Sequence, residues 1–162
     1  MKNPRLSITL GAAVLLACFS PIALSAQQAA APQKSPFLGA SYIITNTDST
    51  GAFASRGVIT LHTDHTLSAI DSGQGGPTSF FTSQLGTWGT SSTGTLTGRT
   101  LDFDFPPNAD VARLDYTFTL GSGGTISGTI TLNTFPLTAN PLGGGGTLVG
   151  TFTFTGYRVT LP

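Results

Sequence analysis

The strongest constraint on the fold is a period-two alternation of apolar and polar residues in the second half of the chain. Between residues 111 and 120 every second position is apolar: Ala112, Leu114, Tyr116, Phe118 and Leu120. The segment 125–132 repeats the pattern, with Ile126, Ile130 and Leu132 on its apolar side. Because successive side chains of a strand point to opposite faces, both segments are predicted to be strands with one buried and one solvated face.

Eight runs rich in Thr, Val, Ile, Phe and Tyr follow one another, separated by Gly, Pro, Asn and Asp. The predicted strands are Ala40–Thr45, Arg56–Thr63, Thr66–Asp71, Phe80–Thr90, Gly94–Phe105, Val111–Leu120, Thr125–Phe135 and Thr147–Thr160. No segment has a helical period. Short links force antiparallel neighbours, so the sequence predicts an all-β chain with a single eight-stranded antiparallel up-and-down β-barrel. The same strand spacing permits a two-sheet β-sandwich, which is the alternative.

The first 26 residues have the pattern of a secretory signal peptide. Lys2 and Arg5 precede an uncharged apolar run over residues 6–19, which is shorter than the roughly 20 residues of a membrane-spanning helix. Small residues then lead to a cleavage point at Ala26. The tetrapeptide that ends at Cys18 also resembles a lipobox, in which Cys18 would become the lipid-bearing first residue.

We therefore expect an exported protein, periplasmic or extracellular, with a lipoprotein anchored through Cys18 as the alternative. The expected organisation is a signal peptide over residues 1–26, a flexible leader over residues 27–36 and a barrel domain over residues 37–162. Cys18 is the single cysteine, so the barrel has to be stable without a disulfide.

The charge composition limits the classes of binding partner that we expect. After residue 26 the chain has five basic side chains against seven aspartates, and it has no glutamate. Without a basic patch, neither nucleic acid nor an anionic membrane surface is an expected partner. The near-zero net charge and the Thr- and Gly-rich polar faces favour self-association into a homo-oligomer. No motif points to a cofactor.

Five motifs resemble a group of small exported bacterial proteins of unassigned function. They are GVITLHTD (57–64), GTWG (86–89), LDFDF (101–105), GTITL (128–132) and GTFTFTG (150–156). Their order is similar to that in lipocalin-like and allene oxide cyclase-like barrels. A lipocalin has its Gly-x-Trp in the first strand, whereas Trp88 falls near the fourth. The resemblance implies a barrel that can hold a small apolar molecule, and it carries over no catalytic residue.

Motifs for other chemistry are weak. His62, Asp64 and His65 are too few for a zinc site, because the rest of the chain after residue 26 has no further His or Cys. We predict instead an exposed hairpin turn in which Asp64 bonds to nearby backbone. No Gly-x-Ser-x-Gly elbow supports a hydrolase triad. The run Gly143–Gly146 lacks the Lys and the helix of a phosphate-binding loop.

The hairpin around Pro106 and Pro107 leads to a specific site hypothesis. If Asp102 pairs with Arg113 on the outer face, then Leu101 faces Leu114, Phe103 faces Ala112, and Arg99 joins Tyr116 inside the barrel. A guanidinium there needs an acceptor from the protein or from a ligand. A slip of one residue would turn Arg99 outward instead. With the conspicuous Trp88, the candidate ligand-binding residues are Arg99, Tyr116, Phe103, Leu114 and Trp88.

The leading functional hypothesis is a non-enzymatic exported barrel that binds a small, largely apolar molecule. The first alternative is a cyclase or isomerase in which Arg99 or Tyr116 polarises an apolar substrate. The second is a structural or surface-interaction protein with a filled barrel. A barrel of inverted polarity would suit an outer membrane, but the chain is poor in charge and ends without an aromatic residue. No stable membrane insertion is expected.

Overall fold

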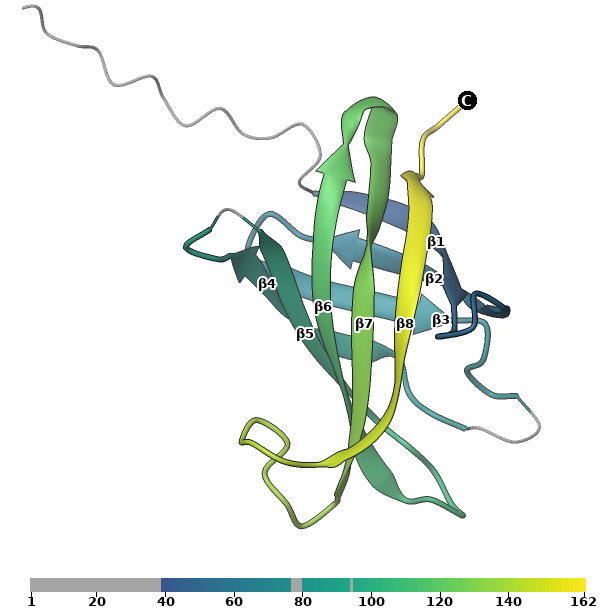
Figure 1. Ribbon diagram of the computed structural model, residues 1–162, viewed down its shortest axis with the longest axis vertical. Coiled ribbons are helices and arrows are strands. Elements are labelled where there is room, and N and C mark those ends of the chain that lie inside the picture. The colour runs from purple at the N-terminus through teal and green to yellow at the C-terminus, as the bar shows by residue number, and fades with distance from the viewer. Residues whose placement is uncertain (1–38, 77–79, 94) are drawn as a thin grey trace, which may run out of the picture. The chain divides into compact units, whose positions relative to one another are not determined.

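A computed structural model describes residues 39–76, 80–93 and 95–162, which form an all-β fold. Eight antiparallel strands close a barrel in chain order, with β8 pairing back onto β1. In Figure 1, β6, β7 and β8 stand upright in front of β1, β2 and β3, which run across behind them. The strands are β1 (Ala40–Thr47), β2 (Phe53–Leu61), β3 (Thr66–Asp71), β4 (Gln84–Thr90), β5 (Leu96–Phe103), β6 (Asp110–Gly121), β7 (Thr125–Pro136) and β8 (Thr147–Arg158).

The predicted eight-stranded up-and-down barrel is confirmed, and the two-sheet sandwich is not what the chain forms. All eight predicted strands are present. The prediction gave both ends of β3 correctly, and the other seven strands differ from it at one or both ends. The largest difference is at β4, which begins at Gln84 rather than Phe80. The predicted signal peptide, leader and lipobox fall within residues 1–38 and so lie outside the described residues. No helix in the described ranges is long and apolar enough to cross a bilayer.

One end of the barrel is closed by aromatic packing. The indole of Trp88 is buried there, and its Nε1 donates a hydrogen bond to the carbonyl oxygen of His62 at 2.9 Å. The ring of His65 lies against the indole, with 4.7 Å between ring centroids. Below Trp88 the interior is filled by apolar side chains, which include Tyr42, Leu61, Leu67, Phe118, Ile126 and Phe154.

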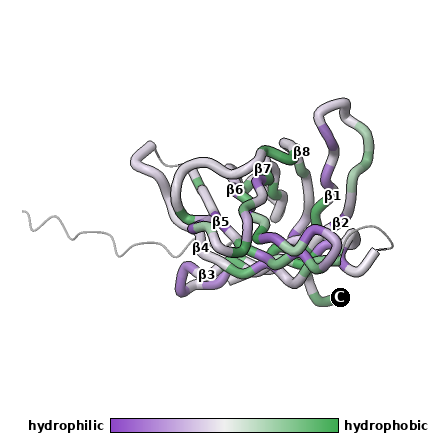
Figure 2. Tube along the Cα trace, turned by 90° about the horizontal axis from the view of Figure 1, so that it is seen from below, coloured by the Kyte–Doolittle hydropathy of each residue, from purple (hydrophilic) through white to green (hydrophobic). Residues whose placement is uncertain are grey.

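The other end is surrounded by four loops. In a meander, alternate connections lie at the same end, so residues 48–52, 72–76, 80–83, 104–109 and 137–146 all gather there. The two longest connections of the barrel, 72–83 and 137–146, belong to this set. Figure 2 looks at the barrel from below, and its strand labels run around the ring in chain order. Loops on a rigid barrel are where binding residues most often occur, so this end is the first place to examine.

Packing around β6 decides which residues face inward. The inner positions predicted for β6 are confirmed, because Ala112, Leu114, Tyr116 and Phe118 are all buried in the core. Strand β5 meets this face with Gly98 opposite Tyr116 and Asp102 opposite Ala112. The predicted register was wrong by one residue. Arg99 and Phe103 therefore lie on the outer face, where the Arg99 side chain is 43% exposed and Phe103 is 54% exposed.

The volume at position 98 is consistent with this register. A Cβ built on Gly98 would lie 2.8 Å from Cδ2 of Leu67, so a residue without a side chain suits this inner position. Because side chains alternate, Thr100 and Asp102 face inward together with Gly98. Apolar character alone did not reveal this, because β5 carries apolar residues on both faces.

Gly128 should stabilise the barrel by allowing β7 to approach β6 closely. It lies between Phe118 and Phe154 in neighbouring strands, and a Cβ at this position would run into the backbone of Thr117 and Phe118. We expect Gly128→Ala to lower the free energy of unfolding by about 1–3 kcal/mol, as overpacking does. The measurement is urea unfolding followed by circular dichroism.

Gly89→Ala is the matched control, since Gly89 is also in a strand and an added Cβ there meets nothing within 4 Å. Equal stability of the two variants would show that the close approach of β6 and β7 does not limit packing.

Candidate functional site

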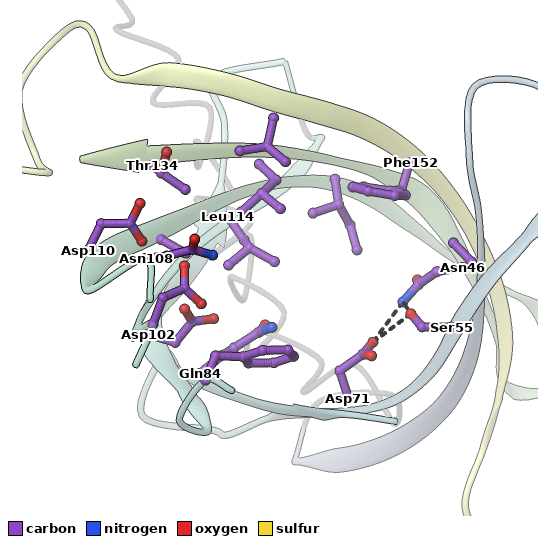
Figure 3. A pocket seen from close by; sticks show the side chains of 17 residues that line it. Asn46, Ser55, Asp71, Gln84, Asp102, Asn108, Asp110, Leu114, Thr134 and Phe152 are labelled. Atoms are coloured by element: carbon purple, nitrogen blue, oxygen red, sulfur yellow. Dashed lines mark hydrogen bonds between the residues drawn. The ribbon is translucent and has the colours of Figure 1, made fainter. Parts of the chain in front are cut away.

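A cavity of about 530 Å³ opens at the loop-bearing end of the barrel, opposite Trp88. We call it the open-end cavity. Figure 3 shows it with polar side chains on two opposite sides and apolar side chains between them. The residues that line it are Asn46, Ala54, Ser55, Asp71, Phe81, Gln84, Asp102, Asp104, Asn108, Asp110, Ala112, Leu114, Ile130, Leu132, Thr134, Val149 and Phe152.

The apolar wall comes from the inner faces of β6, β7 and β8. Leu114 and Ile130 are buried at its base, and Leu132 and Phe152 stand above them half-buried. The β7–β8 ladder shifts register after Leu132, which pairs with Gly150 while the next pair joins Asn133 to Leu148. Val149 is the extra residue of this bulge and adds its side chain to the lining.

On one side of the cavity Asp71 is held by a closed hydrogen-bond network (Figure 3). Its Oδ2 accepts hydrogen bonds from Ser55 Oγ at 2.8 Å and from Asn46 Nδ2 at 3.1 Å. Its Oδ1 accepts one from the backbone N–H of Gly73 at 2.8 Å. Both oxygens of Asp71 are thus satisfied by the protein, which makes this carboxylate a structural element of the wall.

The network leaves one atom of Asn46 unused. The amide nitrogen must face Asp71 and Ser55, because a carboxylate can only accept hydrogen bonds. The amide oxygen Oδ1 then points away and has no partner among the described residues. The side chain is only 6% exposed, so a hydrogen-bond acceptor is left buried at the cavity wall.

On the opposite side three carboxyls come together. Asp102 is the last inner residue of β5, Asp104 follows just after the strand on the same side, and Asp110 begins β6 across the hairpin. The backbone N–H of Asp104 donates to the carbonyl oxygen of Asp110 at 3.0 Å, which fixes the two chains side by side. Asp102 is 3% exposed, and the Oδ1 atoms of Asp102 and Asp110 have no hydrogen-bond partner among the described residues.

Burial and crowding shift the acidity of this group. Burial, with the nearby charges of Asp104 and Asp110, raises the pKa of Asp102 from 3.8 to about 7. Burial and a side-chain hydrogen bond with Asp110 raise the pKa of Asp104 to about 6. Both groups therefore change charge near neutral pH, which is typical of carboxyls at functional sites.

The base of the cavity is held by a hydrogen bond between two buried side chains. Tyr116 Oη donates to Gln84 Oε1 at 2.6 Å, and Gln84 lines the cavity. Burial raises the pKa of Tyr116, so the phenol stays protonated and remains a donor. Tyr116 thus orients Gln84 from below.

The five candidate ligand-binding residues fall in three places. Leu114 lines the open-end cavity, and Tyr116 lies just beneath it. Trp88 closes the opposite end of the barrel. Arg99 and Phe103 are outside, so the prediction that they share the interior with Tyr116 was wrong. Of the five, Leu114 lines this cavity, and Tyr116 acts on it through its hydrogen bond to Gln84.

The outer-face arginines have structural roles. Arg99 forms an ion pair with Asp115, which lies opposite it on β6. The expected pair between Asp102 and Arg113 was wrong, because Arg113 also pairs with Asp115, at 2.9 Å. Arg113 stacks on Phe135 and donates to the carbonyl oxygens of Pro141 and Gly143 at 2.7 and 2.8 Å. It thereby fastens the 137–146 loop beside the cavity mouth.

The hairpin between β2 and β3 forms an exposed turn, as predicted. Asp64 Oδ1 accepts hydrogen bonds from the backbone N–H of Thr66 at 3.0 Å and from its hydroxyl at 2.7 Å. His65 takes a positive φ of 69° in this turn. Within the described ranges, no group of three or more His, Cys, Asp or Glu side chains is arranged to hold a metal ion.

Sequence reasoning missed the residues that distinguish the cavity. Asn46, Asp102, Asp104 and Asp110 all lie on the inner side of the barrel, but their polar character suggested solvent. The sequence carries no signal for Asp102 and Asp104, because they face inward only in the register that pairs Gly98 with Tyr116. Comparison with protein-family models, curated proteins and solved structures finds no match to the chain.

The raised pKa of Asp102 predicts how stability depends on pH. The folded state keeps this proton up to about pH 7, whereas the unfolded chain loses it near 3.8. The folded state thus binds more protons between these values, and the free energy of unfolding should fall as pH rises from about 4 to 7. We expect Asp102→Asn to flatten this decline and to raise the melting temperature at pH 8.

Thermal unfolding at pH 5, 6, 7 and 8 measures the effect. Asp48→Asn is the control, because hydrogen bonds with Thr50 lower the pKa of Asp48 and remove its titration from this range. A wild-type slope in Asp102→Asn would mean that Asp102 is ionised throughout.

Proposed function

We propose that this protein is an exported, non-enzymatic β-barrel that binds a small, largely apolar molecule in the open-end cavity. The observation that carries the proposal is a cavity of about 530 Å³ between a continuous apolar wall and two polar sides. Small-molecule sites are typically concave, of roughly 300–1,000 Å³, and mostly apolar with a few polar groups that orient the ligand.

The unpartnered acceptors support binding over a purely structural role. A buried polar atom without a hydrogen bond costs roughly 1–3 kcal/mol, so a barrel selected only for stability has no reason to keep several. Asn46 Oδ1, Asp102 Oδ1 and Asp110 Oδ1 all belong to residues that line the cavity. A ligand that donates hydrogen bonds at this wall would remove that cost.

An acid–base isomerase is the second candidate. Asp102 and Asp104 have pKa values of about 7 and 6 beside an apolar wall, which suits proton transfer to a bound substrate near neutral pH. The two functions differ in the fate of the ligand. A bound molecule recovered unchanged after prolonged incubation supports binding, and its conversion to an isomer supports the enzyme.

Binding can be tested with N-phenyl-1-naphthylamine, an uncharged apolar probe that fluoresces in dry sites. We expect saturable binding by residues 27–162. Ala112→Phe and Leu132→Trp place a larger side chain in the cavity and should each weaken binding about tenfold or more, which corresponds to about 1.4 kcal/mol.

Thr129→Trp is the matched control, because Thr129 lies on the exposed outer side of β7, the strand that carries Leu132. It should bind the probe like wild type. Unsaturable binding by the wild-type protein, or undiminished binding by both cavity variants, would contradict the proposal.

Export is the other part of the proposal, and the pattern of residues 1–26 supports it. When the full chain is expressed in a Gram-negative bacterium, we expect a protein outside the cytoplasm whose mass begins at Gln27. Cys18→Ser should leave that mass and location unchanged. A lipid-modified species that begins at Cys18, and is lost in Cys18→Ser, would establish the lipoprotein alternative.

A further inference from the structure

We infer that the open-end cavity takes an organic cation, a protonated amine on an apolar body, with the ammonium group held by Asp102, Asp104 and Asp110. This inference rests on the proposed binding function and names the chemical class of its ligand.

The first argument is the charge of the lining. Four of the seven aspartates in the sequence line the cavity, and none of the described lining residues is Lys, Arg or His. The ion pairs of Arg99 and Arg113 both go to Asp115 on the outer face. The charge of the cavity therefore matches a cation and opposes an anion.

The second argument is the direction of the missing hydrogen bonds. The unpartnered atoms at the cavity wall are Asn46 Oδ1, Asp102 Oδ1 and Asp110 Oδ1. An amide oxygen accepts hydrogen bonds, and so does an ionised carboxylate, so the ligand has to supply donors. An ammonium group has three donors and no acceptor, which suits a wall of acceptors.

The third argument is the order of residues along β6. Asp110, Ala112 and Leu114 are successive inner positions, and Asp102 lies opposite Ala112 on β5. A head group at the carboxyls would thus place its apolar body over Ala112 and Leu114, toward Ile130 and Phe152. Figure 3 shows Asp102 and Asp110 on one side of the cavity with Leu114 between them and Phe152.

Asp71 does not take part in this recognition, although it is the fourth acidic residue. Its two oxygens already accept three hydrogen bonds from Asn46, Ser55 and Gly73. A bare metal ion is a poor match for the remaining three carboxyls, since within the described residues they do not form a metal-binding group. The adjoining apolar wall calls for an organic body.

Three compounds with one tail and different heads test the inference: 1-aminooctane, 1-octanol and octanoate. Each is titrated calorimetrically into residues 27–162 and is also used to displace N-phenyl-1-naphthylamine. The work is done at pH 8, above the pKa values of about 7 and 6 of Asp102 and Asp104, where the amine remains protonated. We expect the amine to bind at least about tenfold more tightly than the alcohol, and octanoate to bind least.

Two variants locate the effect. Asp102→Asn and Asp110→Asn keep the shape of the side chain and should each reduce the preference for amine over alcohol to about threefold or less. Asp110 is half-exposed, so Asp110→Asn provides the test if Asp102→Asn does not fold. Asp64→Asn removes the same charge at the closed end and should keep the full preference.

The outcomes separate the two proposals. If the probe binds but the three octyl compounds displace it equally, the cation inference is wrong and the binding function stands. If the amine preference survives in both Asp102→Asn and Asp110→Asn, the assignment to these carboxyls is wrong. If neither the probe nor any octyl compound binds, the binding function fails as well.

Discussion

The inner face of β6 is the constraint on which the rest of the barrel depends. Leu114, Tyr116 and Phe118 fill the centre, and each of the two aromatic rings has a glycine opposite it on one neighbouring strand. The two glycines are Gly98 on β5 and Gly128 on β7. Because side chains alternate, the choice of Gly98 as an inner residue also brings Asp102 inside. The packing of the core and the acidity of the cavity therefore follow from the same register.

One half of the barrel interior stabilises the fold, and the other half forms the open-end cavity. Toward Trp88 it is filled with apolar side chains, and that half supplies most of the hydrophobic stabilisation. Toward the long loops the lining becomes smaller and more polar, with Ala112 above Leu114 and with Asp102 opposite. Burying an unpaired carboxyl disfavours its charged form, so Asp102 resists ionisation until near neutral pH. Such an arrangement weakens the fold and is expected where a ligand provides compensation.

The outer face supports the cavity indirectly. Asp115 binds both Arg99 and Arg113, and Arg113 in turn holds the carbonyl oxygens of Pro141 and Gly143. The polar outer positions of β6 thus fasten the 137–146 loop, which leads into the bulge at Val149. Arg113 is nearly as buried as the core, although the alternation places it on the solvated side. The 137–146 loop, which lies far along the chain from Arg113, covers this side chain.

The sequence by itself determined the number of strands, their approximate positions, their antiparallel order and the buried face of β6. These features are local, because they depend on alternation within a strand and on the residues of short turns. The sequence did not determine the register of β5, since by residue type Leu101 and Phe103 are as suitable for the interior as Thr100 and Asp102. Only the tertiary structure decided that choice, because it sets Gly98 opposite Tyr116, where an added Cβ would lie 2.8 Å from the Leu67 side chain. Only barrel closure brought Asn46 and Asp71, from β1 and β3, to face the carboxyls of β5 and β6, because strands so distant in sequence meet around a common interior.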